Sequence, residues 1–215
     1  MVIKKGDFIE IKFTGKVKGG NIFDSNIKED LDKSKIKGEP RGFIFPVGEK
    51  MFVKGVDDFL IGKDVGEYNV SVSPENAFGK RDPKLIQMVP IKVFIQHRIN
   101  PMPGVMFNFD GKPAKVLTVS GGRVMVDFNN PIAGKEVEYK VDVERMVDDI
   151  NEKVRALNEF FFRKDFEFSV NEKEINMKVP KEMMQFSEMF KDKYKEILGF
   201  NLKIEEAKEI SKVSK

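Results

Sequence analysis

Residues 42–67, GFIFPVGEKMFVKGVDDFLIGKDVGE, decide how this chain folds. The first part of this stretch is apolar and stops at Gly48, which is typical of a short β-strand. The part that follows predicts a short helix that ends at Gly62. Apolar residues at helical spacing share one face of this helix: Val53, Val56, Phe59 and Leu60. We therefore expect a strand with a helix packed beside it.

Strand patterns flank this stretch on both sides. Residues 7–17, DFIEIKFTGKV, alternate apolar and polar side chains, and residues 67–74 do the same until they break at Ser73-Pro74. Much later in the chain, residues 135–143, KEVEYKVDV, form another alternating pattern. The apolar face of this late strand needs the early strands as partners, so the first domain is expected to resume there.

The interruption between these strands has a different character. Residues 86–130 are punctuated by prolines, and TVSGGRVMVDF (118–128) predicts a hairpin with Gly121-Gly122 at its turn. After residue 147 the pattern predicts a helix, two strands, and a helix that opens at Pro180 and runs to Gly199. Residues 202–213 are compatible with a strand or a helix, and we favour a strand.

The composition limits the chemistry that this chain can perform. There is no cysteine, which excludes disulfides, thiolate metal sites and a cysteine nucleophile. The one histidine, His97, has no carboxylate near it in the sequence to complete a metal site or to orient a base. We therefore expect no metal and no cofactor, and an activity that comes from shape, desolvation and hydrogen bonding.

Charge and hydropathy indicate a soluble protein. The chain has 38 Lys and Arg against 35 Asp and Glu, a surplus too small to suggest specific binding of nucleic acid. Residues 85–131 hold the whole surplus. The N-terminal lysines are not followed by the apolar run of a signal peptide, and no run is long enough to span a membrane. We expect a cytoplasmic location.

Four segments, in this order, resemble the FKBP family: FTGKVKGGNIFDS (13–25), residues 42–67, SPENAFG (73–79) and EYKVDVE (138–144). Each segment is short, but their order and spacing match the family's strands, helix, flap and closing strand. The segment NNPIAGKEVEY (129–139) is similar to the return by which an inserted domain rejoins the isomerase fold in SlyD-like members.

The resemblance implies an α+β fold in three parts. An FKBP-like antiparallel β-sheet wrapped on a short helix would comprise residues 1–84 and 132–149. Residues 85–131 would form an insert-in-flap chaperone domain, a small all-β unit. Residues 150–215 would form a C-terminal α+β domain of the long archaeal type.

The resemblance also implies peptidyl-prolyl cis/trans isomerase activity. Rotation of an X-Pro bond crosses a barrier of about 18–20 kcal/mol because it breaks amide resonance. An apolar site that excludes water favours the twisted bond, which has less charge separation. The catalytic positions carried over from the family are Asp24, Phe23, Phe52, Val53 (through its backbone N–H), Phe78 and Tyr139. Further substrate-binding walls would be Phe13, Phe43, Phe45 and Val56.

Three positions depart from the family pattern. Phe13 and Phe78 stand where tyrosine is common, and Val56 stands where a tryptophan often floors the pocket. A side-chain hydroxyl donor is then missing, which keeps a second hypothesis open, a holdase chaperone that binds without catalysis. Taken singly, each phenylalanine is also explained as a core residue and Asp24 as a turn residue.

The inserted unit is rich in apolar side chains for its size. Six of them are predicted to bind unfolded chains: Met88, Ile91, Phe94, Ile95, Met102 and Met106. The competing interpretation is that they fill the unit's own core. The expected partners are unfolded or proline-containing polypeptides, with the ribosome as a further candidate because of the local positive charge. A Met/Phe stripe over residues 183–198 predicts a core or a homodimer contact.

Overall fold

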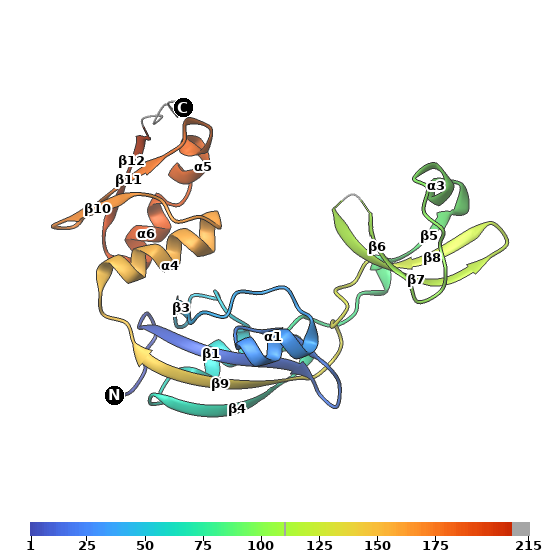
Figure 1. Cartoon of the computed structure of the whole chain (residues 1–215), viewed down its shortest axis with the longest axis horizontal. Coiled ribbons are helices and arrows are strands. Elements are labelled where there is room, and N and C mark those ends of the chain that lie inside the picture. Colours follow the sequence, from blue (N-terminus) through green and yellow to red (C-terminus); the bar gives the residue numbers. More distant parts are fainter. Residues whose placement is uncertain (110, 208–215) are drawn as a thin grey trace. The chain divides into compact units, whose positions relative to one another are not determined.

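The computed structural model of the chain describes residues 1–109 and 111–207 (Figure 1). Contacts within the chain divide it into two compact units. The first unit comprises Met1–Gly15, Ile22–Val70 and Tyr139–Lys215, and the second comprises Lys16–Asn21 and Ser71–Glu138. The second unit thus takes in the inserted segment together with the chain on either side of it. The three-domain division, with boundaries at 84/85, 131/132 and 149/150, stays a prediction.

A five-stranded sheet organises the first unit. Its strands are β1 (Phe8–Val17), β2 (Ile22–Ser25), β3 (Phe43–Pro46), β4 (Gly66–Val72) and β9 (Val137–Met146). The order is β2-β1-β9-β4, and β3 pairs antiparallel with β1, which sets Ile11 opposite Phe43. The strand predicted at residues 135–143 therefore lies between two strands that precede the insertion.

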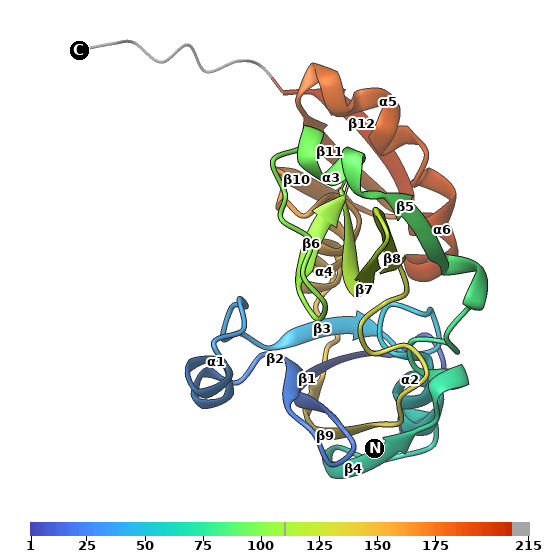
Figure 2. The same ribbon diagram turned by 90° about the vertical axis from the view of Figure 1, so that its right-hand side faces the viewer.

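Helix α2 (Lys54–Leu60) follows β3, as the pattern of residues 42–67 predicts, and lies beside the sheet (Figure 2). Two of its apolar residues, Val56 and Leu60, have no exposed surface. A carboxylate holds the loop before it, because Asp57 accepts hydrogen bonds from the backbone N–H groups of Gly48 at 2.7 Å and Lys50 at 3.1 Å. A further helix, α1 (Lys28–Ser34), follows β2 and was not predicted.

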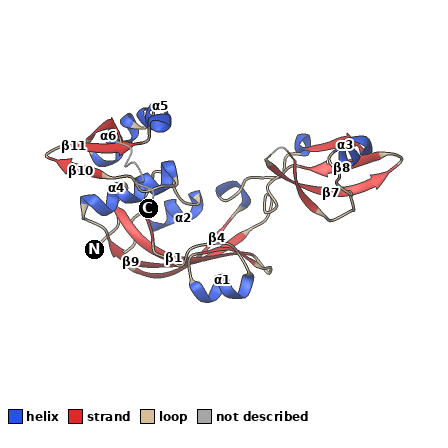
Figure 3. Ribbon diagram, turned by 45° about the horizontal axis from the view of Figure 1, so that its top comes forward, coloured by secondary structure: helices blue, strands red, loops and turns tan. Residues whose placement is uncertain are grey.

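The part of the first unit that follows β9 forms a second sheet with helices. Its elements are α4 (Ile150–Phe162), β10 (Phe168–Asn171), β11 (Glu174–Val179), η3 (Lys181–Met183), α5 (Met184–Glu188), α6 (Lys191–Leu198) and β12 (Asn201–Glu206). Strand β11 pairs antiparallel with β10 and parallel with β12, and the helices between β11 and β12 make the crossover (Figure 3). None of the helices in the described part of the chain is long and apolar enough to cross a membrane.

The C-terminal elements agree with the predictions in type more than in length. The strand favoured within residues 202–213 is confirmed by β12, whereas residues 208–213 lie outside the described residues. The single helix predicted from Pro180 to Gly199 is wrong, since three short helical segments occupy this stretch. The stripe on these segments is partly core and partly surface, because Tyr194 is fully buried while Met189 is 74 % exposed.

The second unit contains a four-stranded sheet and a short helix. Its elements are η1 (Pro74–Asn76), η2 (Pro83–Leu85), β5 (Ile86–Pro90), α3 (Ile91–Gln96), β6 (Met106–Phe109), β7 (Lys112–Ser120) and β8 (Arg123–Asp127). The strand order is β5-β8-β7-β6, and the predicted β7–β8 hairpin turns at Gly121-Gly122. The expectation of strands alone is wrong in one element, α3, for which Pro90 is the N-cap.

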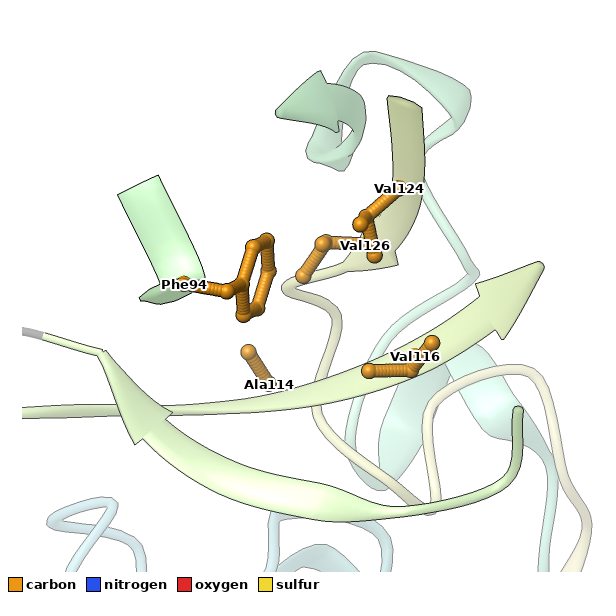
Figure 4. Packing of buried hydrophobic residues seen from close by; sticks show 5 residues of the cluster. All are labelled: Phe94, Ala114, Val116, Val124 and Val126. Atoms are coloured by element: carbon orange, nitrogen blue, oxygen red, sulfur yellow. The ribbon is translucent and has the colours of Figure 1, made fainter. Parts of the chain in front are cut away.

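Helix α3 is held in place by packing, because it contributes the central side chain of this unit's core (Figure 4). The ring of Phe94 has no exposed surface and packs with small side chains of β7 and β8: Ala114, Val116, Val124 and Val126. The burial of Phe94 agrees with the competing interpretation, in which it fills the unit's own core. Ile91 is half-buried and packs against the same core.

Replacing Phe94 by alanine tests this assignment. We expect Phe94→Ala to destabilise the β5–β8 sheet by about 3–5 kcal/mol, because the cavity left among the valines does not close fully. Amide hydrogen exchange of residues 86–127 measures this local stability. Ile95→Ala, in the same helix and 64 % exposed, should change the exchange little. Equal effects of the two variants would contradict the assignment.

Candidate active site

Six aromatic side chains gather in the first unit, and we call them the aromatic cluster. They are Phe13, Phe23, Phe43, Phe45, Phe52 and Tyr139. They come from β1, β2, β3, the loop before α2, and β9. Neighbouring ring centroids lie between 4.9 and 6.5 Å apart, the separation of aromatic rings in contact. Five segments distant in sequence thus converge on one place.

Phe52 is the central ring of the aromatic cluster. Its centroid lies 4.9 Å from Phe13, 5.5 Å from Phe45 and Tyr139, and 5.8 Å from Phe43. Phe13, Phe45 and Tyr139 are buried, whereas Phe23, Phe43 and Phe52 are half-buried. The cluster therefore combines a buried base with rings that reach the surface, which is the arrangement an apolar binding site requires.

The start of α2 contributes a free backbone donor. Val53 is the N-cap residue, and its carbonyl accepts hydrogen bonds from the N–H groups of Val56 and Asp57, both at 2.9 Å. Within residues 1–109 and 111–207 its own N–H has no acceptor. Unpaired N–H groups are expected at a helix start, and this one belongs to a half-buried residue next to Phe52 in the sequence. Val56 itself is fully buried.

Tyr139 brings a hydroxyl into the aromatic cluster. The residue is 1 % exposed, and among the described residues its hydroxyl has no hydrogen-bond partner. Burial, and to a smaller extent the negative charge of Asp24, raises the pKa of this hydroxyl above its ordinary value. The group therefore remains protonated and able to donate.

A glycine that the sequence analysis missed makes room for this tyrosine. A Cβ at Gly15 would stand 2.8 Å from the Tyr139 ring and 3.1 Å from the Phe23 ring. Glycine inside a strand often marks such a close approach, and Gly15 lies two positions after Phe13 in β1. Because residues two apart in a strand share a face, the position of Gly15 relative to Phe13 could have identified it as a neighbour of the cluster.

Asp24 lies next to Phe23 in β2, with its side chain exposed. Protein atoms around its carboxylate displace water and raise its pKa above the ordinary value, while a hydrogen bond from the backbone of Ser25 opposes this. The negative charge of Asp24 also contributes to the raised pKa of the Tyr139 hydroxyl. Asp24 is thus an edge residue of the aromatic cluster rather than part of its interior.

Phe78, another residue predicted to be catalytic, is described within its own unit. Phe78 belongs to the second unit, on the loop after η1, and is half-buried there. The backbone N–H of Gly79 donates to the carbonyl of Pro74 at 2.7 Å and closes this loop. The catalytic role of Phe78 stays a prediction.

The remaining residues predicted to bind unfolded chains are exposed. Their exposed fractions range from 46 % for Met106 to 64 % for Ile95, with Met88 and Met102 between them. Met88 lines a surface hollow of about 350 Å³ together with Met125, its neighbour across β5 and β8. Met125 was not predicted, although the alternation of the hairpin sets it on the opposite face from Val124 and Val126.

Charged side chains do not form a metal site in the described part of the chain. No group of three or more His, Cys, Asp or Glu side chains there could hold a metal ion. The chemistry of the aromatic cluster is therefore that of rings, one hydroxyl and one backbone N–H.

The first unit thus combines an antiparallel sheet, a short helix and a cluster of aromatic rings. The sequence model described as FKBP-type peptidyl-prolyl cis-trans isomerase matches residues 2–95, and the one described as FKBP26, IF domain, matches residues 87–132. The chain belongs to the FKBP-type peptidyl-prolyl cis-trans isomerase family, which confirms the resemblance.

Relatives from archaea and bacteria agree with this family. The short-type peptidyl-prolyl cis-trans isomerase of Methanocaldococcus jannaschii is 35 % identical over 66 % of this chain and 92 % of its own length. The SlyD protein of Aeromonas hydrophila is 28 % identical over 63 % of this chain and 60 % of its length. The FKBP-type 16 kDa isomerase of Escherichia coli is 27 % identical over 66 % and 91 %. These matches cover about two thirds of this chain.

Replacing either of two buried tyrosines by phenylalanine should change the stability of the protein in opposite directions. Tyr139→Phe removes an unpaired hydroxyl, so the free energy of unfolding should rise by about 1 kcal/mol. Tyr194→Phe removes a hydroxyl that donates to Asn158 Oδ1 at 2.6 Å, so the free energy of unfolding should fall by about 1–2 kcal/mol. Urea denaturation measures both. A loss of stability in Tyr139→Phe would mean that its hydroxyl is paired in the folded protein.

Proposed function

We propose that this protein accelerates folding by isomerising X-Pro bonds at the aromatic cluster. The observation that carries the proposal is the cluster of six rings in which Phe52 contacts four others, with a free backbone N–H at the start of the adjacent helix. Relatives named peptidyl-prolyl cis-trans isomerases support it. A proline ring bound against these rings is removed from water, which favours the twisted imide over the planar one.

The Val53 N–H would hold the substrate by donating to a substrate carbonyl. This fixes one side of the X-Pro bond, while the apolar rings allow the other side to rotate. The step needs no proton transfer and no covalent intermediate. Catalysis would arise because the site binds the twisted X-Pro bond more strongly than the planar one.

The hydroxyl of Tyr139 would replace the donor that Phe13 and Phe78 lack. It is buried and protonated, and its ring lies 6.2 Å from Phe13 and 5.9 Å from Phe23. An unpaired buried hydroxyl lowers stability, so its presence is explained best by a partner that arrives with the substrate. Asp24, at the edge, would keep this hydroxyl protonated through its negative charge.

The exposed methionines of the second unit would bind unfolded chains before their prolines are isomerised. Methionine side chains are flexible and polarisable, and they adapt to varied partners. Met88, Met102 and Met106 are each about half exposed. A chain held there is at a high effective concentration for the isomerase site.

The rival function is a holdase chaperone that uses the isomerase fold as a scaffold without catalysis. The replacement of tyrosine at Phe13 and Phe78 favours it. Homodimerisation through residues 150–215, ribosome contact and a cytoplasmic location stay predictions.

Truncation of the central ring separates these two functions. We expect Phe52→Ala to lower kcat/KM for a proline tetrapeptide at least tenfold, because it opens the aromatic cluster to water and removes contacts with four rings. Proline-limited refolding of a test protein should slow in parallel. An unaltered rate would leave the holdase as the function.

Two further variants make this test specific. Phe59→Ala removes another half-buried ring, which contacts Tyr68 rather than the aromatic cluster, and it should leave kcat/KM nearly unchanged. Tyr139→Phe should lower kcat/KM several-fold even though it stabilises the fold. The double variant with Phe13→Tyr should recover part of the loss, because it returns a hydroxyl from the facing strand.

Substitution of the exposed methionines tests the chaperone role. Changing Met88, Met102 and Met106 together to glutamine should spare tetrapeptide isomerisation and lower catalysis on an unfolded protein several-fold. Met189→Gln, which alters a methionine that is 74 % exposed in the first unit, is the control. Equal loss on both substrates would argue against a division of labour.

A further inference from the structure

A cavity of about 420 Å³ lies in the first unit between the segment that leads into β3 and helix α4. Part of its lining is apolar: Phe43, Ile44, Ala156 and Phe160. The rest is charged and comes from both segments. A volume of this size is in the range of sites that bind small molecules or a few peptide side chains.

Most charged groups at this cavity already have partners. Arg41 pairs with Glu159 at 2.9 Å and with Glu39 at 3.0 Å. Glu152 pairs with Arg145 at 2.8 Å. These pairs leave little charge for a ligand to meet.

Two guanidinium groups retain donors for a ligand. Arg155 forms a long ion pair, 3.8 Å, with Asp165, which also lines the cavity, and this separation is too large for a hydrogen bond. The side chain of Arg163 forms no ion pair with any residue that the structure describes. Because a guanidinium binds a carboxylate through two parallel hydrogen bonds, the ligand that fits this pair of arginines carries a carboxylate.

The cavity and the aromatic cluster share one residue, Phe43. This ring lines the cavity and also stacks on Phe45 at 5.2 Å and contacts Phe52 at 5.8 Å. Because Phe43 belongs to both, a polypeptide whose proline occupied the cluster would have neighbouring residues within reach of the cavity.

We propose that this cavity binds the substrate chain on one side of the proline and selects a segment with an apolar residue next to an acidic one. The apolar side chain packs on Phe43, Ile44 and Phe160, and the carboxylate binds Arg155 and Arg163. The inference rests on the proposed function, because it places the proline in the aromatic cluster. It assigns sequence preference to α4, a helix outside the cluster.

Peptides with one proline and a single scanned residue test the inference. At each position within five residues of the proline, matched peptides carry Glu, Gln or Lys next to a leucine. At one or two positions on the same side of the proline, the Glu peptide should have a KM about two- to fivefold below that of the Gln peptide, the range expected of a solvent-accessible ion pair. The Lys peptide should bind more weakly than both.

Variants of α4 identify the groups responsible. Arg163→Gln and Arg155→Gln should each reduce the Glu/Gln ratio, and together they should abolish it, with kcat/KM for a tetrapeptide unchanged. Lys153→Gln is the matched control, because this lysine lies on the same helix with its ammonium over the Phe8 ring. Ala156→Leu, which fills the cavity, should weaken the longer peptides and spare the tetrapeptide.

The outcomes separate this inference from the proposed function. Equal KM values for Glu and Gln peptides at every position, or a ratio that survives in the double arginine variant, would overturn the inference while tetrapeptide catalysis stands. If the tetrapeptide is not isomerised, the proposed function fails. Calorimetric binding of the Glu and Gln peptides then still decides whether the cavity prefers a carboxylate.

Discussion

The aromatic cluster depends on two hydrogen bonds to one buried carboxylate. Phe52, its central ring, lies in neither a strand nor a helix but in the irregular loop between β3 and α2. Asp57 holds this loop by accepting the N–H groups of Gly48 and Lys50. Asp57 is 2 % exposed, and its burial raises the pKa of its carboxyl. Burial of the Asp57 carboxylate is unfavourable, but its hydrogen bonds fix the loop that carries Phe52.

Local patterns predicted the fold better than they predicted the site. Alternation and glycine stops gave the strand and helix of residues 42–67, because both depend on neighbours in sequence. Helix α3 was not predicted because the apolar run around Phe94 is equally typical of a strand, and only packing against β7 and β8 selects a helix. Gly15 was not predicted either, because the residue that leaves no room for a side chain at this position is Tyr139, which lies far away in the sequence on β9.

The exchange of tyrosine and phenylalanine shows what residue identities alone leave open about the site. A loss of hydroxyls at Phe13 and Phe78 suggested an apolar pocket without a side-chain donor. Tyr139, on the strand that carries the closing segment, restores one hydroxyl within the same group of rings. What matters for a hydrogen bond to the substrate is the position of the hydroxyl oxygen. The neighbouring strands β1 and β9 could each place a tyrosine hydroxyl among these rings. The sequence names both residues but not their separation.

Apolar rings are suited to isomerisation and poorly suited to selection. Every prolyl ring presents nearly the same surface, so contacts with Phe52 and its neighbours would stabilise the twisted bond in any sequence. Discrimination between substrates requires groups that read the residues around the proline. In the first unit the candidates for such groups are Arg155 and Arg163, which line the cavity that Phe43 also lines. Catalysis and selection would then reside in different side chains that share one ring, so that either property would be open to change while the other is kept.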